Sequence, residues 1–128
     1  MKVKDFSGHS RVLRQAKNAF PNTILIVGVN DDKSTHAIKG PTVTKDYERY
    51  EAVRNCRFVD YVLPAAPWGP YDQKFMDFYK FDFMAHDDLP SPRGEGVDPS
   101  DPNACAYAEV KVSKNLCTFK LFSHTSLV

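Results

Sequence analysis

The pair Gly8-His9 stands at the start of a segment with helical periodicity, Ser10 to Phe20. A glycine lets the backbone come close to a ligand, and the free N–H groups at a helix N-terminus attract an anion. A histidine beside them can donate a hydrogen bond to a phosphoryl oxygen. The pair is therefore a candidate phosphate site. The alternative is a glycine turn followed by an exposed histidine, because motifs this short often arise without a function.

Two further candidates are basic. Lys39 precedes Gly40 in a polar stretch, and its flexible ammonium group could reach a triphosphate, although most lysines in loops are only solvated. The segment RYEAVRNCRFVD carries three arginines, of which Arg57 comes just after the expected end of a helix. The helix dipole favours a cation there, and that alone would account for Arg57.

The motifs PWGP and HDD could together form one pocket. An exposed tryptophan such as Trp68 in a proline-rich loop offers a face to a quaternary ammonium group. His86, Asp87 and Asp88 follow an apolar run, and carboxylates there could accept a hydrogen bond from the amino group of a base or hold a metal. The alternatives are a core tryptophan and an Asp-rich turn.

The helices and strands expected around these residues indicate an α/β fold. The helix Ser10 to Phe20 is followed by TILIVGV, a run that is apolar on both faces and typical of a central strand of a parallel sheet. A helix followed by a buried strand is half of a βαβ unit. The polar stretch Asn30 to Pro41 is expected to be a loop. Thr44 is then the expected cap of a helix over Lys45 to Cys56.

Strands and helices continue to alternate after this helix. FVDYVL predicts a short strand, the prolines of PAAPWGP a loop, and Asp72 to Tyr79 a helix that buries Phe75, Met76 and Phe78. FDFMA predicts a second buried strand with HDD at its carboxyl end. Ligands bind at that end in open α/β sheets.

Composition divides the chain into residues 1–90, an α/β unit, and residues 91–128, a tail. The tail opens with PSPRGEGVDPSDPNA, which is rich in proline, glycine, serine and aspartate and predicts loop or disorder. A hairpin around Ser113 to Asn115 is the one regular feature expected there.

The overall numbers exclude several classes of protein. The chain has 128 residues, enough for one domain, and its formal net charge of +1 gives no general case for binding nucleic acid. Its three cysteines predict neither a disulfide framework nor a zinc site. There is no apolar run of about 20 residues to cross a membrane and no signal-peptide pattern. A soluble, cytoplasmic protein is expected.

Five segments arrive in an order that identifies a family resemblance: SGH, FPNTILIVGV, KGPTV, ERYEAVRNCRFVDYVLPAAPW and FDFMAHDDLP. Over about residues 6–90 the chain resembles the choline-phosphate cytidylyltransferases of the HxGH nucleotidyltransferase superfamily. The AHDD ending is similar to the choline rather than the ethanolamine enzymes. The resemblance implies a Rossmann-like parallel sheet, a homodimer, and a reaction of phospholipid biosynthesis. In that reaction CTP and phosphocholine give CDP-choline and pyrophosphate, with Mg²⁺ accompanying the CTP.

The resemblance also implies roles for individual residues. His9, next to Gly8, matches the second histidine of HxGH and would stabilise charge on the phosphates, while Lys39 would grip them. Both are the expected catalytic residues. The expected nucleotide-binding residues are Gly8, His9, Lys39, Arg57 and Asp88, with Asp88 reading the cytosine amino group. The expected choline-end residues are Trp68, His86 and Asp87.

The chain departs from the family pattern at three places. Phe6 stands where HxGH has its first histidine, and losing one such donor typically costs on the order of 10²–10³ in rate. Only MKVKD precedes it, where the family has a central strand, so the sheet is expected to be incomplete. No RTEGIST-like motif follows Ser91. These departures leave an alternative open: an inactive truncated paralogue or isoform that acts as a dimerisation or regulatory partner.

Overall fold

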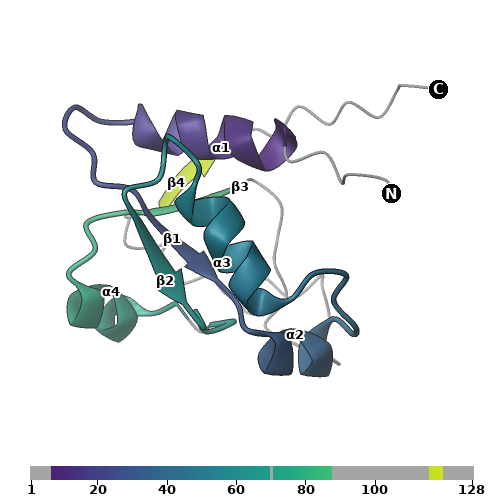
Figure 1. Ribbon diagram of the computed structural model, residues 1–128. Coiled ribbons are helices and arrows are strands. Elements are labelled where there is room, and N and C mark those ends of the chain that lie inside the picture. Colours follow the sequence, from purple (N-terminus) through teal and green to yellow (C-terminus); the bar gives the residue numbers. More distant parts are fainter. Residues whose placement is uncertain (1–6, 70, 88–115, 120–128) are drawn as a thin grey trace.

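The structure is a computed structural model that describes residues 7–69, 71–87 and 116–119. Helices and strands alternate along most of the chain (Figure 1). In order they are α1 (Ser7–Lys17), β1 (Ile26–Val29), α2 (Asp32–Ile38), α3 (Asp46–Arg54), β2 (Tyr61–Pro64), α4 (Gln73–Tyr79), β3 (Met84–Asp87) and β4 (Leu116–Phe119).

The strands form two parallel pairs. β1 pairs with β2 in a register that sets Ile26 opposite Tyr61, and β3 pairs with β4 with Met84 opposite Leu116. The predicted α/β class with parallel pairing is confirmed, and the arrangement is that of an incomplete Rossmann-like fold. The described part of the chain contains these two pairs rather than one continuous sheet.

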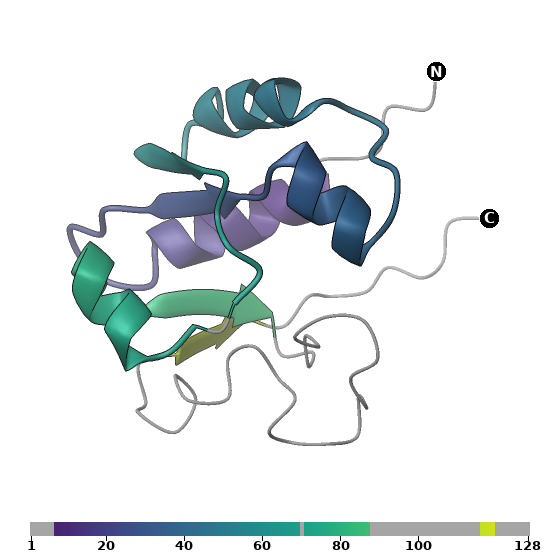
Figure 2. The ribbon, with the colours of Figure 1, turned by 90° about the horizontal axis from the view of Figure 1, so that it is seen from below.

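Helix α1 begins three residues earlier than its periodicity predicts. Gly8 and His9 therefore belong to its first turn rather than to a turn before it, and the helix ends at Lys17 rather than at Phe20. α1 runs antiparallel to β1, so that its first turn lies on the side where β1 ends (Figures 1 and 2). The Gly-His pair thus keeps its place at a helix N-terminus.

Two predictions about the segment after β1 are wrong. The stretch expected to be a loop contains α2, whose first turn is capped by the Asp31 carboxylate accepting from the Ser34 backbone N–H at 2.8 Å. This helix is short and buries none of its side chains, so no apolar periodicity announces it. The cap of α3 is Lys45 rather than Thr44, because the Lys45 backbone N–H donates to the Glu48 carboxylate at 2.8 Å.

Burial also differs from expectation. Met76 is buried with 1% exposure and Phe75 is half-buried, but Phe78 is 79% exposed, so its predicted burial is wrong. Phe83 is 49% exposed, and β3 begins only at the next residue. The buried hydrophobic side chains of the described part are Ala16, Leu25, Ala66 and Met76. A helix of two turns can bury one narrow face, and α4 turns Met76 rather than Phe78 inward.

Strand β4 comes from the segment in which a hairpin was expected. The structure pairs Leu116–Phe119 in parallel with β3, and the rest of the expected hairpin lies outside the described residues. None of the helices that the structure describes has both the length and the apolar character that a membrane crossing requires.

Candidate functional site

The carboxyl ends of β1 and β2 are joined by three close approaches. The Asn30 side-chain amide donates to the Ala66 carbonyl at 2.7 Å, and the Ala66 N–H donates to the Val29 carbonyl at 3.1 Å. A Cβ atom on Gly28 would lie only 2.9 Å from the Cβ of Ala66. The glycine lets β1 approach the segment that follows β2, and this segment leads directly to Trp68.

The first turn of α2 is tied together by Asp31. Its carboxylate accepts from the Ser34 backbone N–H and from the Ser34 hydroxyl, while the Thr35 hydroxyl donates to the Asp31 carbonyl at 2.6 Å. The hydrogen bond from the Ser34 hydroxyl, followed by that from the Ser34 backbone, lowers the pKa of the Asp31 carboxyl below its ordinary value. These hydrogen bonds fix the Ser34 hydroxyl, whose oxygen accepts a hydrogen bond from the Trp68 indole N–H.

Arg49 on α3 holds the segments around α2 in place. Its guanidinium donates to the Asp32 carboxylate at 2.7 Å, to the Thr44 carbonyl at 2.6 Å and to the Asn30 carbonyl at 2.8 Å. The hydrogen bond from Arg49 is the main cause that lowers the pKa of the Asp32 carboxyl. The forked donor geometry of arginine links the end of β1 to the starts of α2 and α3. Arg49 thus holds these segments together rather than offering a free cation to a ligand.

The structure brings Lys39 and Trp68 together at this end of the sheet. The Trp68 indole N–H donates to the Ser34 hydroxyl at 3.2 Å, and the Lys39 ammonium lies 4.9 Å from the centroid of the Trp68 rings. Lys39 follows α2 directly, and Gly40 after it has a φ of 94°, a conformation that favours glycine. Lys39 is exposed, so its ammonium group can leave the ring for an anion.

Other predicted site residues lie on the same side of the fold. Gly8 and His9 occupy the first turn of α1, and His86 and Asp87 are the last two residues of β3. The backbone positions of all four are therefore at the carboxyl ends of the strands, where an α/β sheet binds ligands (Figure 2). Asp88 lies outside the described residues.

Arg57 is not brought to this group. It precedes the amino end of β2, with its guanidinium carbon 4.7 Å from the centroid of the Phe58 ring, whereas Lys39 and Trp68 follow the carboxyl ends of the strands. Its nucleotide-binding role stays a prediction that this single chain does not support by proximity.

The amino ends of β1 and β2 are tied together by Asp60. Its carboxylate accepts from the Lys17 ammonium at 2.5 Å and from the Leu25 N–H at 2.7 Å, and Lys17 also donates to the Thr23 carbonyl at 2.6 Å. The Lys17 hydrogen bond is the main cause that lowers the pKa of the Asp60 carboxyl. These contacts anchor the C-terminal end of α1, so they set its direction over the sheet.

Sequence reasoning missed the structural importance of Asp31, Ser34 and Arg49. A signal for Asp31 was present, because aspartate is a favoured N-cap residue and Asp31 stands in the polar segment NDDKST. Nothing in the spacing of Arg49 pointed to Asp32, since the two meet only through the packing of α3 beside β1 (Figure 1).

The described side chains do not form a metal cage. No group of three histidine, cysteine, aspartate or glutamate residues in this part of the chain could hold an ion. The two carboxylates nearest the site, Asp31 and Asp32, are already occupied by Ser34 and by Arg49.

What the arrangement offers is an ammonium group, an indole face and helix N–H groups at one edge of a parallel sheet. Comparisons with known proteins identify the family. Residues 7–92 match the family model described as cytidylyltransferase-like. Choline-phosphate cytidylyltransferase A of Homo sapiens is 55% identical over 84 residues, which are 66% of this chain and 23% of that protein.

Two further relatives extend the comparison. The probable choline-phosphate cytidylyltransferase of Schizosaccharomyces pombe is 53% identical over 91 residues, 71% of this chain and 25% of that protein. The ethanolamine-phosphate cytidylyltransferase of Dictyostelium discoideum is 37% identical over 91 residues, 71% of this chain and 24% of that protein. The chain thus spans about a quarter of the length of these relatives. The family resemblance is confirmed, and with well over half of its residues inside the family model the chain belongs to the cytidylyltransferase-like family.

Proposed function

We propose that the chain carries part of the catalytic domain of a choline-phosphate cytidylyltransferase, which joins CTP and phosphocholine to give CDP-choline and pyrophosphate. The observation that carries the proposal is the Lys39 ammonium over the Trp68 ring at the carboxyl ends of β1 and β2. One group suits a phosphate and the other suits a quaternary ammonium. The names of the choline-phosphate relatives, which are 46–55% identical against 37% for the ethanolamine-phosphate relative, favour phosphocholine.

In the proposed reaction a phosphate oxygen of phosphocholine attacks the α-phosphorus of CTP. The new P–O bond forms as the bond to the β-phosphate oxygen breaks, and pyrophosphate leaves with that electron pair. A transfer of this kind needs alignment and positive charge more than a covalent intermediate. The N–H groups of the α1 first turn and His9 would face the phosphates, and Lys39 would neutralise their charge.

The choline end would be the Trp68 side of the same edge. The Lys39 ammonium occupies the cation position over the ring, at 4.9 Å from its centroid. A triphosphate offers Lys39 a full opposite charge, so it would draw the ammonium away and free the indole face for trimethylammonium. His86 and Asp87 would complete that end, and Asp88 would accept from the cytosine amino group.

Magnesium enters this proposal as part of the substrate, Mg²⁺-CTP. The described carboxylates near the site are engaged with Ser34 and Arg49, so the ion would be held mainly by phosphate oxygens and water, as Mg²⁺ commonly is.

A second candidate function is that of a weakly active or inactive partner of a complete subunit. The observation that favours it is Phe6, which stands where the resemblance expects a histidine and has no hydrogen to donate to a phosphate. A dimerising partner would bind a complete homologue whether or not CTP is present. A homodimer would be the corresponding assembly for the active enzyme.

The test is to incubate the purified chain with Mg²⁺-CTP and phosphocholine and to follow CDP-choline by ³¹P NMR. The active enzyme forms product, and the Lys39→Ala variant loses about 10²-fold or more in kcat/KM, the scale of one lost charge-stabilising donor. Lys33→Ala is the matched control, because Lys33 is an exposed lysine of α2, the helix that Lys39 follows directly. Absence of product from a folded chain, with retained binding to a complete homologue, would support the partner function instead.

A further inference from the structure

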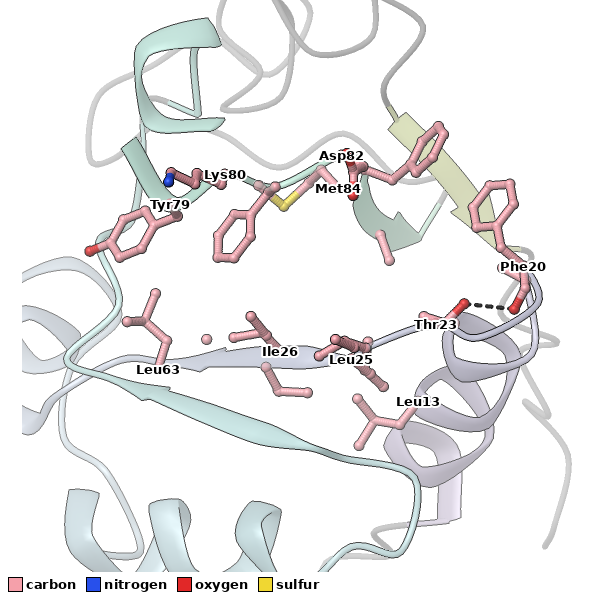
Figure 3. A pocket seen from close by; sticks show the side chains of 18 of the residues that line it. Leu13, Phe20, Thr23, Leu25, Ile26, Leu63, Tyr79, Lys80, Asp82 and Met84 are labelled. Carbon is pink, nitrogen blue, oxygen red and sulfur yellow. Dashed lines mark hydrogen bonds between the residues drawn. The ribbon is translucent and has the colours of Figure 1, made fainter. Parts of the chain in front are cut away.

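The segment that carries Lys39, residues 39–44, is held by hydrogen bonds rather than by packing. It connects α2 to α3 on the outside of the fold (Figures 1 and 2), and Val43 within it is 90% exposed. The apolar cavity between β1 and β3, with a volume of about 860 Å³, takes none of its lining from α2 or from this segment (Figure 3). Contacts with the core therefore do not fix the direction of Lys39.

The beginning of the segment is fixed by the backbone of α2. The N–H groups of Lys39 and Gly40 both donate to the Thr35 carbonyl, at 2.8 and 3.2 Å. Gly40 has a φ of 94°, and the chain reverses its direction there. These contacts place the backbone of Lys39, but they do not hold the chain that returns after the turn.

The side chain of Thr42 ties the returning chain to α2. Its hydroxyl donates to the Asp32 carboxylate at 3.2 Å, and its oxygen lies 3.0 Å from Nε2 of His36. Asp32 and His36 are four residues apart, so they lie on one face of α2. Glycine, proline and valine occupy the other positions of residues 40–43, so Thr42 has the only side chain there that can make hydrogen bonds.

The Asp32 carboxylate sets the direction of these hydrogen bonds. Arg49 donates to the same oxygen, Oδ1, at 2.7 Å and is the main cause that lowers the pKa of this carboxyl, so the group is ionised and accepts. The single hydrogen of the Thr42 hydroxyl goes to Asp32, and Nε2 of His36 is then the donor to the Thr42 oxygen. A side chain without a hydroxyl at position 42 breaks both contacts.

Trp68 is attached to the same helix, because its indole N–H donates to the Ser34 hydroxyl at 3.2 Å. α2 therefore holds both the ring and the turn that carries the ammonium group, and the two meet at 4.9 Å. We infer that Thr42 is a positioning residue for Lys39: by tying the turn to α2 it keeps the ammonium group at the Trp68 ring and at the carboxyl ends of the strands. The catalytic consequence rests on the proposed function, whereas the placement of Lys39 does not.

The test measures how iodide and caesium quench the fluorescence of Trp68 in the whole chain. Trp68 is the single tryptophan and is half-buried, so a quencher can reach it. In water at low ionic strength a unit positive charge at 4.9 Å raises the local iodide concentration about fourfold and lowers that of caesium by a similar factor. Lys39→Met should therefore lower the ratio of iodide to caesium quenching by about fourfold or more.

Thr42→Val replaces the hydroxyl by a methyl group and should lower the same ratio by about twofold or more, because Lys39 is no longer held at the ring. Thr42→Ala, which also lacks the hydroxyl but sets no methyl group against the Asp32 carboxylate, should do the same and replaces Thr42→Val if that variant does not fold. Thr42→Ser keeps the hydroxyl and should keep the ratio of the unchanged protein.

Thr44→Val is the matched control, because Thr44 is exposed and its hydroxyl has no hydrogen-bond partner among the described residues. It should leave the ratio unchanged. The double variant Thr42→Val/Lys39→Met should give the ratio of Lys39→Met alone, since a residue that acts through Lys39 has no effect once the ammonium group is gone.

Three results would overturn the inference. They are an unchanged ratio in Thr42→Val and Thr42→Ala, an equal change in Thr44→Val, or a further fall of the same factor when Thr42→Val is added to Lys39→Met. The last result would show that the hydroxyl affects Trp68 without acting on Lys39.

Turnover is the second readout. In an active chain Thr42→Val should lower kcat/KM for Mg²⁺-CTP about tenfold or more, Thr42→Ser should restore most of it, and Thr42→Val should cost nothing further in Lys39→Ala. Unchanged turnover in Thr42→Val would overturn the catalytic consequence. If even the unchanged protein forms no product, the proposed activity fails, and the quenching ratios still decide whether Thr42 places Lys39.

Discussion

Replacing Gly28 by alanine tests how closely the two strand ends must approach at the candidate site. The new Cβ atom would lie 2.9 Å from the Cβ of Ala66. Carbon atoms in favourable contact are about 3.5–4.0 Å apart, so β1 and the segment after β2 must separate by roughly 0.6–1 Å. That movement would disturb the Asn30 to Ala66 and Ala66 to Val29 hydrogen bonds, at 2.7 and 3.1 Å.

The expected cost follows from two opposing effects. Forcing an extra methyl group into a packed contact costs about 1–3 kcal/mol. Alanine also restricts the unfolded chain more than glycine does, which returns about 0.4–1 kcal/mol. We therefore expect Gly28→Ala to lower the free energy of unfolding by about 1–2 kcal/mol and Tm by roughly 5–10 °C in a domain of this size.

A double-mutant cycle separates the clash from other effects. Ala66→Gly removes the opposing methyl group, so the double variant Gly28→Ala/Ala66→Gly should recover most of the loss, with a coupling energy of about 1 kcal/mol or more. The assay is urea unfolding of the four proteins followed by circular dichroism. Gly40→Ala serves as a contrast, because no atom lies within 4 Å of its added Cβ and any cost comes from its φ of 94°. If the effects of Gly28→Ala and Ala66→Gly are additive to within about 0.5 kcal/mol, the close approach does not constrain the fold and the reasoning is refuted.

Three other outcomes are expected. The Lys17 ammonium lowers the pKa of the Asp60 carboxyl, so this pair stabilises the fold above the ordinary aspartate pKa of about 4 and the contribution is lost as pH falls through the folded-state pKa. The urea midpoint of Asp60→Asn should therefore fall less steeply between pH 7 and 3 than that of the unchanged protein. The same slope in both proteins would contradict this. Met76→Ala should lower the free energy of unfolding by about 2–5 kcal/mol, because the Met76 side chain is 1% exposed. Met76→Leu, which nearly keeps the side-chain volume, should lower it by less than about 1.5 kcal/mol. Equal losses in the two variants would show that side-chain volume at position 76 is unimportant. Trp68 is the single tryptophan of the chain, so its fluorescence should change when Mg²⁺-CTP draws the Lys39 ammonium away from the ring. The fluorescence of Lys39→Met should not change when Mg²⁺-CTP is added. The same response in both proteins would place the nucleotide elsewhere.

Much of the fold was predictable because apolar runs and helical periodicity carry local information. TILIVGV, FVDYVL and FDFMA each contain or overlap a strand of the structure, and β1 and β2 pair in parallel as their character predicts. The misses have local causes too. α2 is short and polar, so no periodicity announces it, and its start depends on the capping contact from Asp31 to Ser34. Phe78 is exposed because α4 is too short to bury two faces.

The candidate site was predictable as a set of residue types but not as a geometry. The sequence pointed to Lys39 and Trp68, yet they are distant in the chain and meet only because β1 and β2 pair in parallel and set their carboxyl ends side by side. Arg57 looked equivalent to them in sequence. Arg57 precedes the amino end of β2, whereas Trp68 follows its carboxyl end, and the two ends of a strand lie at opposite edges of the sheet.

The sequence by itself determined the family and the α/β class, because both are encoded in residue types and in their order along the chain. Only the tertiary structure decided which of the candidate residues lie at the same edge of the sheet. It also decided that Arg49 donates three hydrogen bonds to neighbouring segments, and that β1 and β3 face each other across an apolar cavity. The physical reason is that strand pairing and burial depend on contacts between residues far apart in the chain, and composition or periodicity within a short window does not specify those contacts.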